Sequence, residues 1–408
     1  MTPPALASVL TRLALFLVRI DLVFPKLPPA LDGIGDHTAR LAAAVSARGH
    51  GVRVLTAQPG ADRIPGVSVE RAFSLHRRRG VRRVAEAVQS DPPDWLLVQF
   101  NQFSYGRWGF NPHLPLAVRR MKRQQPGVRV AVLFHEDFLP VTSWRNAVMT
   151  TWQRAQFWAL GRLADVAAFS IEPWAQTYRR WFPQAEVVHW PVGSNIPREG
   201  TGRAEAKAAL DISGTTLVAG VFGTLHASRM LPFIARAVRG LWEEDDREMT
   251  VLYVGPDGKK LKAALPSVPV RDAGRLPAEA VSRHLAAMDV HLAPFVDGAS
   301  TRRGSLMAGL QHGVATLTTY GPLTDRTIRR ADGDALLLTS TDDARGFAQR
   351  AVRLAARPQL RAGVAEAGRA LYDRAFSWEV LSRRVEGTLC DAMPAAPESH
   401  ILQQEATP

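Results

Sequence analysis

Two adjacent arginines, Arg302 and Arg303, lie in a stretch that could bind an anion, from Pro294 to Thr319. The apolar run VHLAPF at its start predicts a buried strand, and the carboxyl ends of such strands border the ligand crevice of open α/β sheets. A helix is expected to follow, with the arginines in or just before its first turn. Cations oppose the helix dipole there, so we expect them to complement an anion held by the free N–H groups of that helix end. A solvated arginine pair is the alternative.

Hydroxyl and glycine residues surround the two arginines. Ser300, Thr301 or Ser305 is expected to cap the helix, and Gly304 precedes its apolar residues. The helix is expected to end at His312-Gly313, where another buried strand begins. This succession of strand, Gly-containing loop and helix favours a ligand crevice at this point.

A second group of candidates lies at the ends of strands in the N-terminal half. His135 and Glu136 are at the carboxyl end of a strand predicted over 129–137, where they could transfer a proton or orient a sugar hydroxyl. A structural role is the alternative for such a pair. Gly33 and Gly35 follow the first predicted strand and are expected on the same sheet edge, which favours a common site.

The segment around these glycines is expected to be a loop that leads into a helix. Its prolines and glycines disfavour regular structure, and Asp32 or Asp36 can cap the helix. Gly-x-Gly alone is a weak motif, which also fits an ordinary tight turn.

Four tryptophans supply flat apolar surface in the same half of the chain. Most are expected to be core or helix-packing residues, and one or two could stack on a sugar or contact lipid. They are Trp108, Trp144, Trp152 and Trp158.

Two series of alternating strands and helices must position these residues. Their patterns predict an α/β fold of two doubly wound, Rossmann-like domains that face each other across a cleft. The turn-rich segment that begins at Trp190 is the best linker, so the first domain is expected to span 1–195 and the second to begin at 196. Strands are expected over 18–24, 52–56, 94–100 and 129–137, and over 216–223, 250–255, 289–295 and 314–319.

The composition fits two domains and restricts the partners. A chain of 408 residues exceeds the length at which a single core keeps growing. The only cysteine, Cys390, excludes a disulfide framework and a cysteine-based metal site, so a reducing, cytoplasmic compartment is expected. The net charge of +13 favours anionic partners, which include nucleotide phosphates, anionic lipid and nucleic acid.

Charged residues argue against a membrane span in the N-terminal run ALASVLTRLALFLVRIDLVF. Arg12, Arg19 and Asp21 leave no uninterrupted segment of about 20 apolar residues. No small-residue cleavage site follows a clean apolar core, so a signal peptide is not expected either. The basic run from Arg77 to Arg83 suits an anionic membrane surface, so at most a peripheral association with the inner face of the membrane is expected.

Six segments occur in a characteristic order along the chain: DGIGDHTARLAAAVSARGHGVRVLT, FHE, PVGSNIP, VFGTLHASR, GRLPAEAVSRHLAAMDVHLAPF and TRRGSLMAGLQHG. The collinear set resembles the retaining glycosyltransferases of family 4, which have the GT-B fold, from about Val18 to about Leu389. The resemblance implies a nucleotide-sugar donor held mainly by the second domain, 196–375, and an acceptor held mainly by the first. The acceptor would be a glycan, a glycolipid or a related molecule, as in bacterial polysaccharide assembly. No metal or other cofactor is implied.

The resemblance also concerns the end of the chain. It implies a C-terminal helix within 376–393 that crosses back to the first domain. The tail, 394–408, is expected to be unstructured because it lacks a periodic apolar pattern.

Carried over position by position, the resemblance assigns roles to several candidates. Gly33 and Gly35 match the family's Gly-rich loop, which approaches the donor, and His135 matches a histidine that faces the transferred sugar. The segment from Gly223 matches the diphosphate loop. In it, Thr224 replaces an arginine and Arg229 replaces a lysine, so one of the two usual cations is missing.

The Glu-x7-Glu pattern of the family is degenerate. Its second glutamate, which binds the nucleotide ribose, is replaced by Ala308. The first falls at Ser300 or, if the loop is longer, near Asp297, which is our candidate for the surviving carboxylate.

The implied mechanism requires charge stabilisation more than a nucleophile. Negative charge that develops on the leaving diphosphate would be stabilised by Arg229, the arginine pair and the N–H groups from Thr301 to Ser305. Asp36, His135 and Glu136 are candidates for handling the acceptor proton or orienting sugars.

Two functions other than sugar transfer remain as alternatives. A catalytically silent binding subunit of the same fold is favoured by Thr224 and Ala308. A nucleic-acid binder is favoured only by the charge, because no helix-turn-helix, RNP or zinc signature is present in the sequence.

Overall fold

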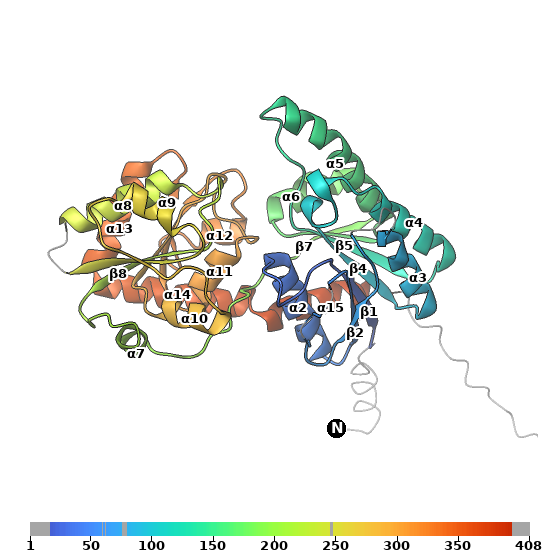
Figure 1. Cartoon of the computed structure of the whole chain (residues 1–408), viewed down its shortest axis with the longest axis horizontal. Coiled ribbons are helices and arrows are strands. Elements are labelled where there is room, and N and C mark those ends of the chain that lie inside the picture. Colours follow the sequence, from blue (N-terminus) through green and yellow to red (C-terminus); the bar gives the residue numbers. More distant parts are fainter. Residues whose placement is uncertain (1–16, 59, 62, 76–79, 245–247, 394–408) are drawn as a thin grey trace, which may run out of the picture.

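The computed structural model describes residues 17–393 except 59, 62, 76–79 and 245–247. It contains two α/β domains side by side, each built on a parallel sheet (Figure 1). The expectations for the start of the N-terminal run, for the arginines at 77–79 and for the tail, 394–408, lie outside the described residues. Within the described residues, no helix is both long and apolar enough to cross a bilayer.

The first sheet has seven strands in the order β3-β2-β1-β4-β5-β6-β7, and the second has six in the order β10-β9-β8-β11-β12-β13. In each sheet the chain moves outward to one side and then crosses to the other, so the order reverses between β1 and β4 and between β8 and β11. This is the topology of a doubly wound α/β domain. The predicted fold class is confirmed.

The strand bounds follow the buried apolar runs. In the first sheet they are β1 (Arg19–Val23), β2 (Gly51–Thr56), β3 (Ser68–Arg71), β4 (Trp95–Phe100), β5 (Arg129–Phe134), β6 (Val166–Phe169) and β7 (Glu186–His189). In the second sheet they are β8 (Leu217–Phe222), β9 (Met249–Val254), β10 (Val270–Asp272), β11 (Val290–Ala293), β12 (Ala315–Tyr320) and β13 (Leu337–Ser340).

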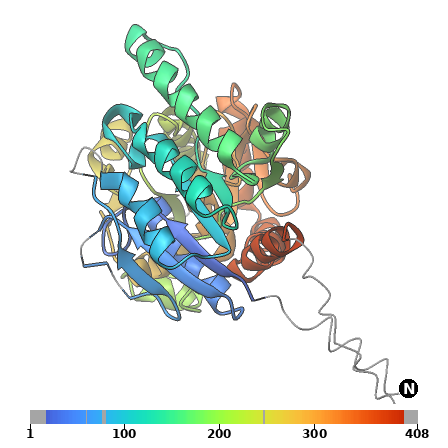
Figure 2. The same cartoon turned by 90° about the vertical axis from the view of Figure 1, so that its right-hand side faces the viewer.

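Helices connect the strands and cover both faces of each sheet (Figures 1 and 2). Those of the first half are α2 (Gly33–Ser46), α3 (Arg83–Ser90), α4 (His113–Gln124), α5 (Trp144–Leu163) and α6 (Glu172–Tyr178). Those that follow are α7 (Arg203–Ala208), α8 (Leu231–Glu244), α9 (Gly258–Ala264), α10 (Ala278–Ala286), α11 (Gly304–Gln311), α12 (Arg326–Arg330), α13 (Ala344–Ala356), α14 (Pro358–Ala375) and α15 (Trp378–Asp391).

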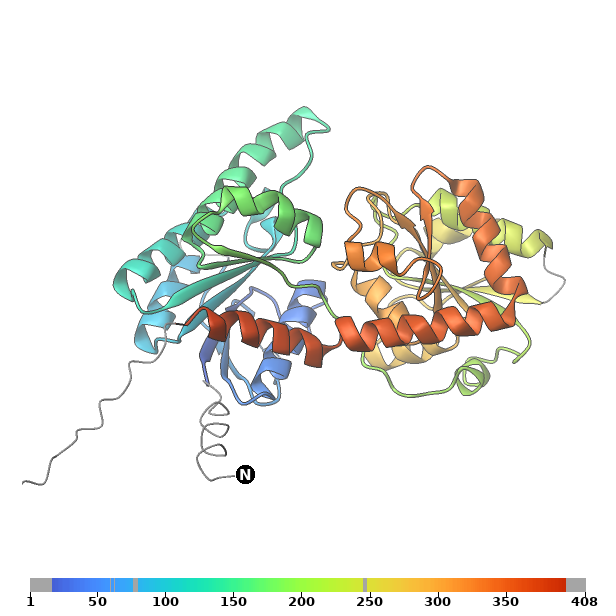
Figure 3. The same ribbon diagram turned by 180° about the vertical axis from the view of Figure 1, so that it is seen from behind.

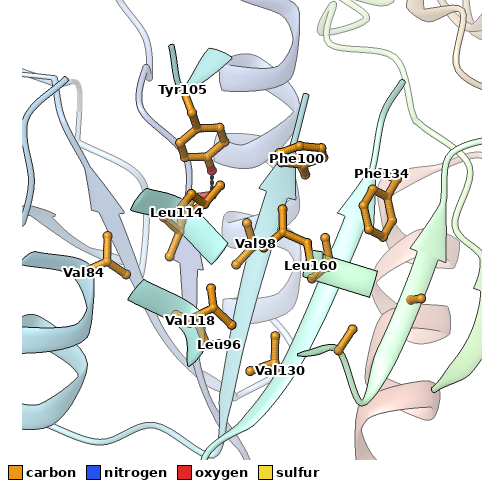
Figure 4. Close-up of a cluster of buried hydrophobic side chains, with 14 of the residues drawn as sticks. Val84, Leu96, Val98, Phe100, Tyr105, Leu114, Val118, Val130, Phe134 and Leu160 are labelled. Carbon is orange, nitrogen blue, oxygen red and sulfur yellow. Dashed lines mark hydrogen bonds between the residues drawn. The ribbon is translucent and has the colours of Figure 1, made fainter. Parts of the chain in front are cut away.

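The central strands of the first sheet are buried because their side chains alternate between two cores. In β4, Leu96 and Val98 face the core beneath α3, α4 and α5, whereas Trp95 and Leu97 face the core beneath α2 and α15. Figure 4 shows the first core, in which Val84 of α3, Leu114 and Val118 of α4, and Leu160 of α5 pack over the sheet. Both faces of the sheet are therefore covered, and a ligand must approach the ends of the strands.

The C-terminal helices link the two domains (Figure 3). Helix α14 belongs to the second domain, and α15 continues along α2 of the first domain. Val385 and Leu389 of α15 share a core with Leu41 of α2, and Nε1 of Trp378 donates to the carbonyl oxygen of Ser194 at 2.8 Å. The last helix therefore packs on the helix whose N-terminus borders the candidate site.

Candidate active site

A pocket of about 560 Å³ lies between the domains at the carboxyl ends of their strands. The first domain contributes Gly33, His135 and Glu136, and the second contributes Arg302 and Gly304. Five of the predicted site residues thus line one pocket. A larger hollow, of about 740 Å³, contains none of them, so we assign the site to the smaller one.

The wall from the first domain begins with the first turn of α2. Asp32 is the N-cap, and its carboxylate accepts hydrogen bonds from the N–H groups of Ile34 and Gly35 at 3.0 and 3.1 Å. Of the two expected caps, Asp32 is therefore the correct one. The expectation that Gly33 and Gly35 lie in an irregular loop is wrong, because this cap starts the helix at Gly33.

The two glycines have different surroundings. A Cβ atom at Gly35 would lie 2.6 Å from the carbonyl oxygen of Lys26, so only glycine lets these two backbone segments approach. A Cβ atom at Gly33 would meet nothing within 4 Å, and Gly33 lines the pocket. Gly35 thus serves packing, whereas Gly33 keeps the pocket open.

This difference gives a paired test. Gly35→Ala is expected to lower the free energy of unfolding by about 1–3 kcal/mol, because the new methyl group meets backbone. Gly33→Ala is expected to keep or slightly raise stability, since alanine is favoured over glycine in helices by up to about 1 kcal/mol, while ligand binding weakens. Urea unfolding of both variants checks this, and an equal loss of stability in the two would contradict it.

His135 is the buried residue that follows β5. Its Nε2 atom lies 2.6 Å from Oε1 of Gln99, and because an amide oxygen only accepts, Nε2 carries the proton and donates. Burial lowers the pKa of His135 well below its usual value, and the neighbouring His37 lowers it further. The ring is therefore neutral at pH 7, with Nδ1 as an acceptor.

His37 is a pocket residue that the sequence did not reveal. Its ring contacts those of His135 and Trp378, with centroids 5.1 and 5.2 Å away. Both ring nitrogens are buried, and neither has a hydrogen-bond partner among the described residues. Burial lowers the pKa of His37 to about 4, so this ring is also neutral. Its spacing of four from Gly33 places both on one face of α2, which is the signal that could have identified it.

Asp36, by contrast, does not line the pocket. Burial raises its pKa to about 6, and the nearby charge of Asp32 adds to the increase. The helix turns this carboxylate away from the face that Gly33 and His37 share, since adjacent helical residues point in different directions. We therefore replace Asp36 with His37 among the candidates.

In the second domain, Arg229 lies at the switch point between β8 and β11, where the chain order reverses. Its Nη2 atom donates to the carbonyl oxygen of Phe222 and to Oγ of Ser305, the latter at 3.2 Å. The guanidinium stacks on Phe295 with its Cζ atom 4.5 Å from the ring centroid. Gly223, which has a φ of +98°, passes close to the same group.

The charge of Arg229 is uncompensated in the described structure. The residue is 7% exposed, its Nη1 atom is buried without a hydrogen-bond partner, and no described carboxylate forms an ion pair with it. Burial lowers its pKa to about 9, aided by the charge of Arg303, so it remains cationic at neutral pH. An isolated buried charge is costly, and a bound anion would remove that cost.

Arg302 and Arg303 have carboxylate partners within the chain. Arg302 donates to Glu136 across the domain boundary and to Asp297 at 2.5 Å. Arg303 donates to both carboxylate oxygens of Asp297, at 2.6 and 2.9 Å, and to Oγ of Ser228. The anions that these arginines complement here are Glu136, for Arg302, and Asp297, for both arginines. Asp297 is therefore an ion-pair partner with both oxygens occupied.

The capping prediction for the following helix is wrong. Helix α11 begins at Gly304 with Arg303 at the N-cap position, and no side chain caps it. Ser305 lies inside the first turn, where its Oγ atom contacts Arg229. Ser300 is fully buried, and its Oγ atom has no partner among the described residues.

Thr301 joins the domains, which is why it cannot cap the helix. Its Oγ1 atom donates to the carbonyl oxygen of Ser170 at 2.8 Å, and its carbonyl oxygen accepts from the N–H of Val192 at 2.9 Å. Its own N–H donates to Asp325, whose other carboxylate oxygen accepts from the N–H of Glu172 at 2.6 Å. This network holds the loop that carries Arg302 against the first domain.

Thr224, the position of the missing cation, is exposed and is not among the residues of the pocket. Ala308 is fully buried in the second-domain core with Val218 and Leu252. A carboxylate at that position would have to displace this packing.

Sequence comparison identifies no relative: no protein-family model and no curated protein sequence match this chain. Solved structures do match it over nearly its whole length. Sucrose-phosphate synthase from Thermosynechococcus elongatus superposes with a TM-score of 0.70 at 16% identity, over 92% of this chain and 98% of that one. The chain has the GT-B glycosyltransferase fold.

Two further GT-B structures show how widely this fold is shared. WaaG, a glycosyltransferase involved in lipopolysaccharide biosynthesis, matches with a TM-score of 0.65 at 17% identity, over 91% of this chain and 99% of that one. Anabaena Alr3699/HepE, solved with UDP and glucose, matches with a TM-score of 0.63 at 14% identity, over 92% of this chain and 100% of that one. At these identities the likeness concerns the fold, and the activity must be argued from the site.

Among the described residues, no group of three or more His, Cys, Asp or Glu side chains could hold a metal ion. That the reaction requires no metal ion stays a prediction. Of the cationic side chains, Lys26 of the first domain and Arg302 of the second line the pocket, whereas Arg229 lies outside its lining.

Proposed function

We propose that this chain is a glycosyltransferase that moves a sugar from a nucleotide-sugar donor to an acceptor. The observation that carries the proposal is Arg229, a buried cation at the switch point of the second GT-B domain that has no counter-charge among the described residues. A diphosphate supplies the negative charge that this position lacks. The neighbouring structures support the choice, since one of them was solved with UDP-glucose.

The second domain, proposed to span 196–375, would hold the donor. Arg229 and the first N–H groups of α11, at Gly304 and Ser305, would bind the diphosphate, because these helix N–H groups have no intrahelical acceptor. As the bond to the sugar breaks, negative charge grows on the leaving diphosphate. Fixed donors in a site that excludes water stabilise this charge most strongly in the transition state.

The first domain, proposed to span 1–195, would hold the acceptor and the transferred sugar. His135 and His37 are neutral and lie beside each other in the pocket, so they can exchange hydrogen bonds with sugar hydroxyl groups. Glu136, also in the pocket, is the candidate for receiving the acceptor proton. The donor diphosphate leaves on the face from which the acceptor attacks, which retains the anomeric configuration without a covalent nucleophile or a metal.

The acceptor is proposed to be a glycan or glycolipid of the kind used in polysaccharide assembly, at the cytoplasmic face of a membrane. The silent binding subunit is the second candidate, because Thr224 and Ala308 remove a cation and a carboxylate that the resemblance implies. Both candidates bind the donor, and only turnover separates them.

Turnover is tested by incubating the purified chain with a panel of nucleotide sugars and measuring the nucleoside diphosphate released. The proposal expects release from at least one donor, faster when the acceptor is present, and product of unchanged anomeric configuration by NMR. Donor binding without release would establish the silent subunit instead.

A further inference from the structure

Most of the four tryptophans of the first domain were expected to be core or helix-packing residues, and that expectation is wrong, because three of them are exposed. Trp144 is 74% exposed, Trp108 is 61% exposed and Trp158 is 51% exposed. Trp152 alone of the four is half-buried, and its ring packs against Phe110 with centroids 5.8 Å apart. We call the surface formed by the exposed side chains of α5 and of the 3-10 turn η3 (Arg107–Gly109) the α5–η3 face.

Helix α5 has a regular stripe of exposed residues that includes Trp144, Val148 and Trp158. Residues 144, 148, 151, 155, 158 and 162 are all exposed, and their alternating spacing of four and three places them on one side of the helix. The opposite side is buried and includes the core residues Phe157 and Leu160 together with Gln153 and Gln156. The helix thus exposes large apolar side chains although its other side already packs on the sheet, and such exposed apolar surface marks an interaction site.

The buried Gln156 holds the η3 turn beside this stripe. The side-chain amide of Gln156 donates to the carbonyl oxygen of Gly109 at 2.7 Å, and its oxygen accepts from the N–H of Asn111 at 2.5 Å. Directly before Gly109, Trp108 has a φ of 57° and a ψ of 20°, in the left-handed region. That conformation is strained for a bulky residue, and it holds an exposed tryptophan outward.

Positive charge accompanies the aromatic rings. Arg107 stacks on Trp108, Arg145 on Trp144 and Arg162 on Trp158, with distances of 4.7, 5.5 and 5.5 Å to the ring centroids. From 95 to 164 the chain has nine Lys and Arg residues but only two acidic ones, of which Glu136 lies in the pocket and Asp137 accepts from the hydroxyl of Tyr178. Arg145 is in the first turn of α5, where the helix dipole opposes it, so an external anion would stabilise it.

We propose that the α5–η3 face docks on an anionic lipid bilayer. Tryptophan and arginine together suit the interface, where the ring lies at the level of the headgroups and the guanidinium reaches phosphate. The N-terminal part of α5 extends beyond the rest of its domain (Figures 1 and 2), a convex shape that meets a flat surface more readily than a pocket. A second copy of the chain is disfavoured, because a symmetric contact would bring two positive faces together.

Docking of this face would bring a membrane-held acceptor to the proposed transferase. Only this statement about the acceptor rests on the proposed function. The turn that precedes η3, η2 (Gln102–Ser104), lines the pocket with Phe103 and Ser104. An acceptor held in the bilayer would therefore meet the pocket beside the docking surface. Vesicle binding needs no turnover, so failure of the docking and failure of the transferase can be distinguished.

The test is flotation of the whole chain with vesicles of phosphatidylcholine and phosphatidylglycerol, and with vesicles of phosphatidylcholine alone. We expect binding to the anionic vesicles that weakens as salt increases. Arg145→Glu/Arg162→Glu and Trp144→Ser/Trp158→Ser are each expected to lower affinity at least about tenfold, since each basic residue near an anionic surface contributes about 1 kcal/mol.

Matched variants control for charge and for lost tryptophan. Arg345→Glu/Arg353→Glu makes the same change in net charge on α13, and Trp181→Ser/Trp242→Ser removes two exposed tryptophans outside the α5–η3 face. Both should bind vesicles like the parent chain. Absence of vesicle binding by the parent, or equal losses in test and control variants, would overturn the proposal, as would a dimer in solution that only the α5 substitutions dissociate.

Discussion

Arg229→Gln is expected to weaken binding of a nucleoside diphosphate by about 10- to 150-fold, while binding of the nucleoside alone changes little. A hydrogen bond to a charged group contributes about 1.5–3 kcal/mol, and the Nη1 atom of this guanidinium is a buried donor without a partner in the described part of the chain. Because the substitution also removes a costly buried charge, the free energy of unfolding should stay the same or increase. Calorimetric titration of the parent and the variant with both ligands measures the difference.

The control for this variant is Arg236→Gln, an exposed arginine on the neighbouring helix α8. It changes the net charge equally and should leave both affinities unchanged. Equal diphosphate affinity in the parent and in Arg229→Gln would show that the buried cation has another role, and it would remove the main support for the proposed donor site.

A double substitution of Arg302 and Arg303 is a poorer test than the sequence alone would indicate. Both arginines hold Asp297, and Arg302 also holds Glu136 of the other domain. Removing them leaves partly buried carboxylates unpaired, and breaking such pairs commonly costs several kcal/mol. Any loss of binding would then be mixed with a loss of stability and of domain contact.

His135→Ala is expected to lower kcat by about a hundredfold and to change the donor Kd by less than about twofold. One well-placed hydrogen-bonding or proton-transfer group contributes on the order of 10²-fold or more to turnover. His135 belongs to the first domain, whereas Arg229 belongs to the second and does not line the pocket. The measurement is steady-state turnover together with calorimetric donor binding.

Gln99→Leu tests how His135 is positioned. This change removes the acceptor of the Nε2 proton and keeps the histidine, so a smaller loss of kcat is expected, on the order of tenfold. His284→Ala on α10, which is outside the pocket, is the matched control and should retain full turnover. Unchanged turnover in His135→Ala would mean that this ring is a packing residue.

Long apolar runs made most of the fold predictable. The strand expected over 94–100 is β4, and the one expected over 250–255 is β9. Both could be predicted because a parallel strand that is buried on both faces has a continuous run of apolar residues. The strands that were not predicted are short, such as β6 and β10, with four and three residues. Segments of that length carry no periodicity, and their pairing is decided by neighbouring strands.

The site was only partly predictable, for the same physical reason. His135 and Glu136 could be placed because the carboxyl end of a parallel strand is a local property. The pairing of Arg302 with Glu136 joins residues 166 positions apart, and no local pattern specifies it. The outward tryptophans of α5 have the same helical spacing as a packing stripe, so the sequence alone does not show that the side with Phe157 and Leu160 is the one that packs on the sheet.

The most direct test of the donor site is a thermal-shift measurement of the parent chain with a panel of nucleotide sugars and their nucleosides. A ligand at about 100 times its Kd adds roughly 2.7 kcal/mol to the free energy of unfolding. We expect at least one nucleotide sugar to stabilise the chain by this amount, and its nucleoside to stabilise it much less. A panel in which no nucleotide sugar raises the melting temperature, or in which the nucleoside acts equally well, would contradict the proposed diphosphate site at Arg229.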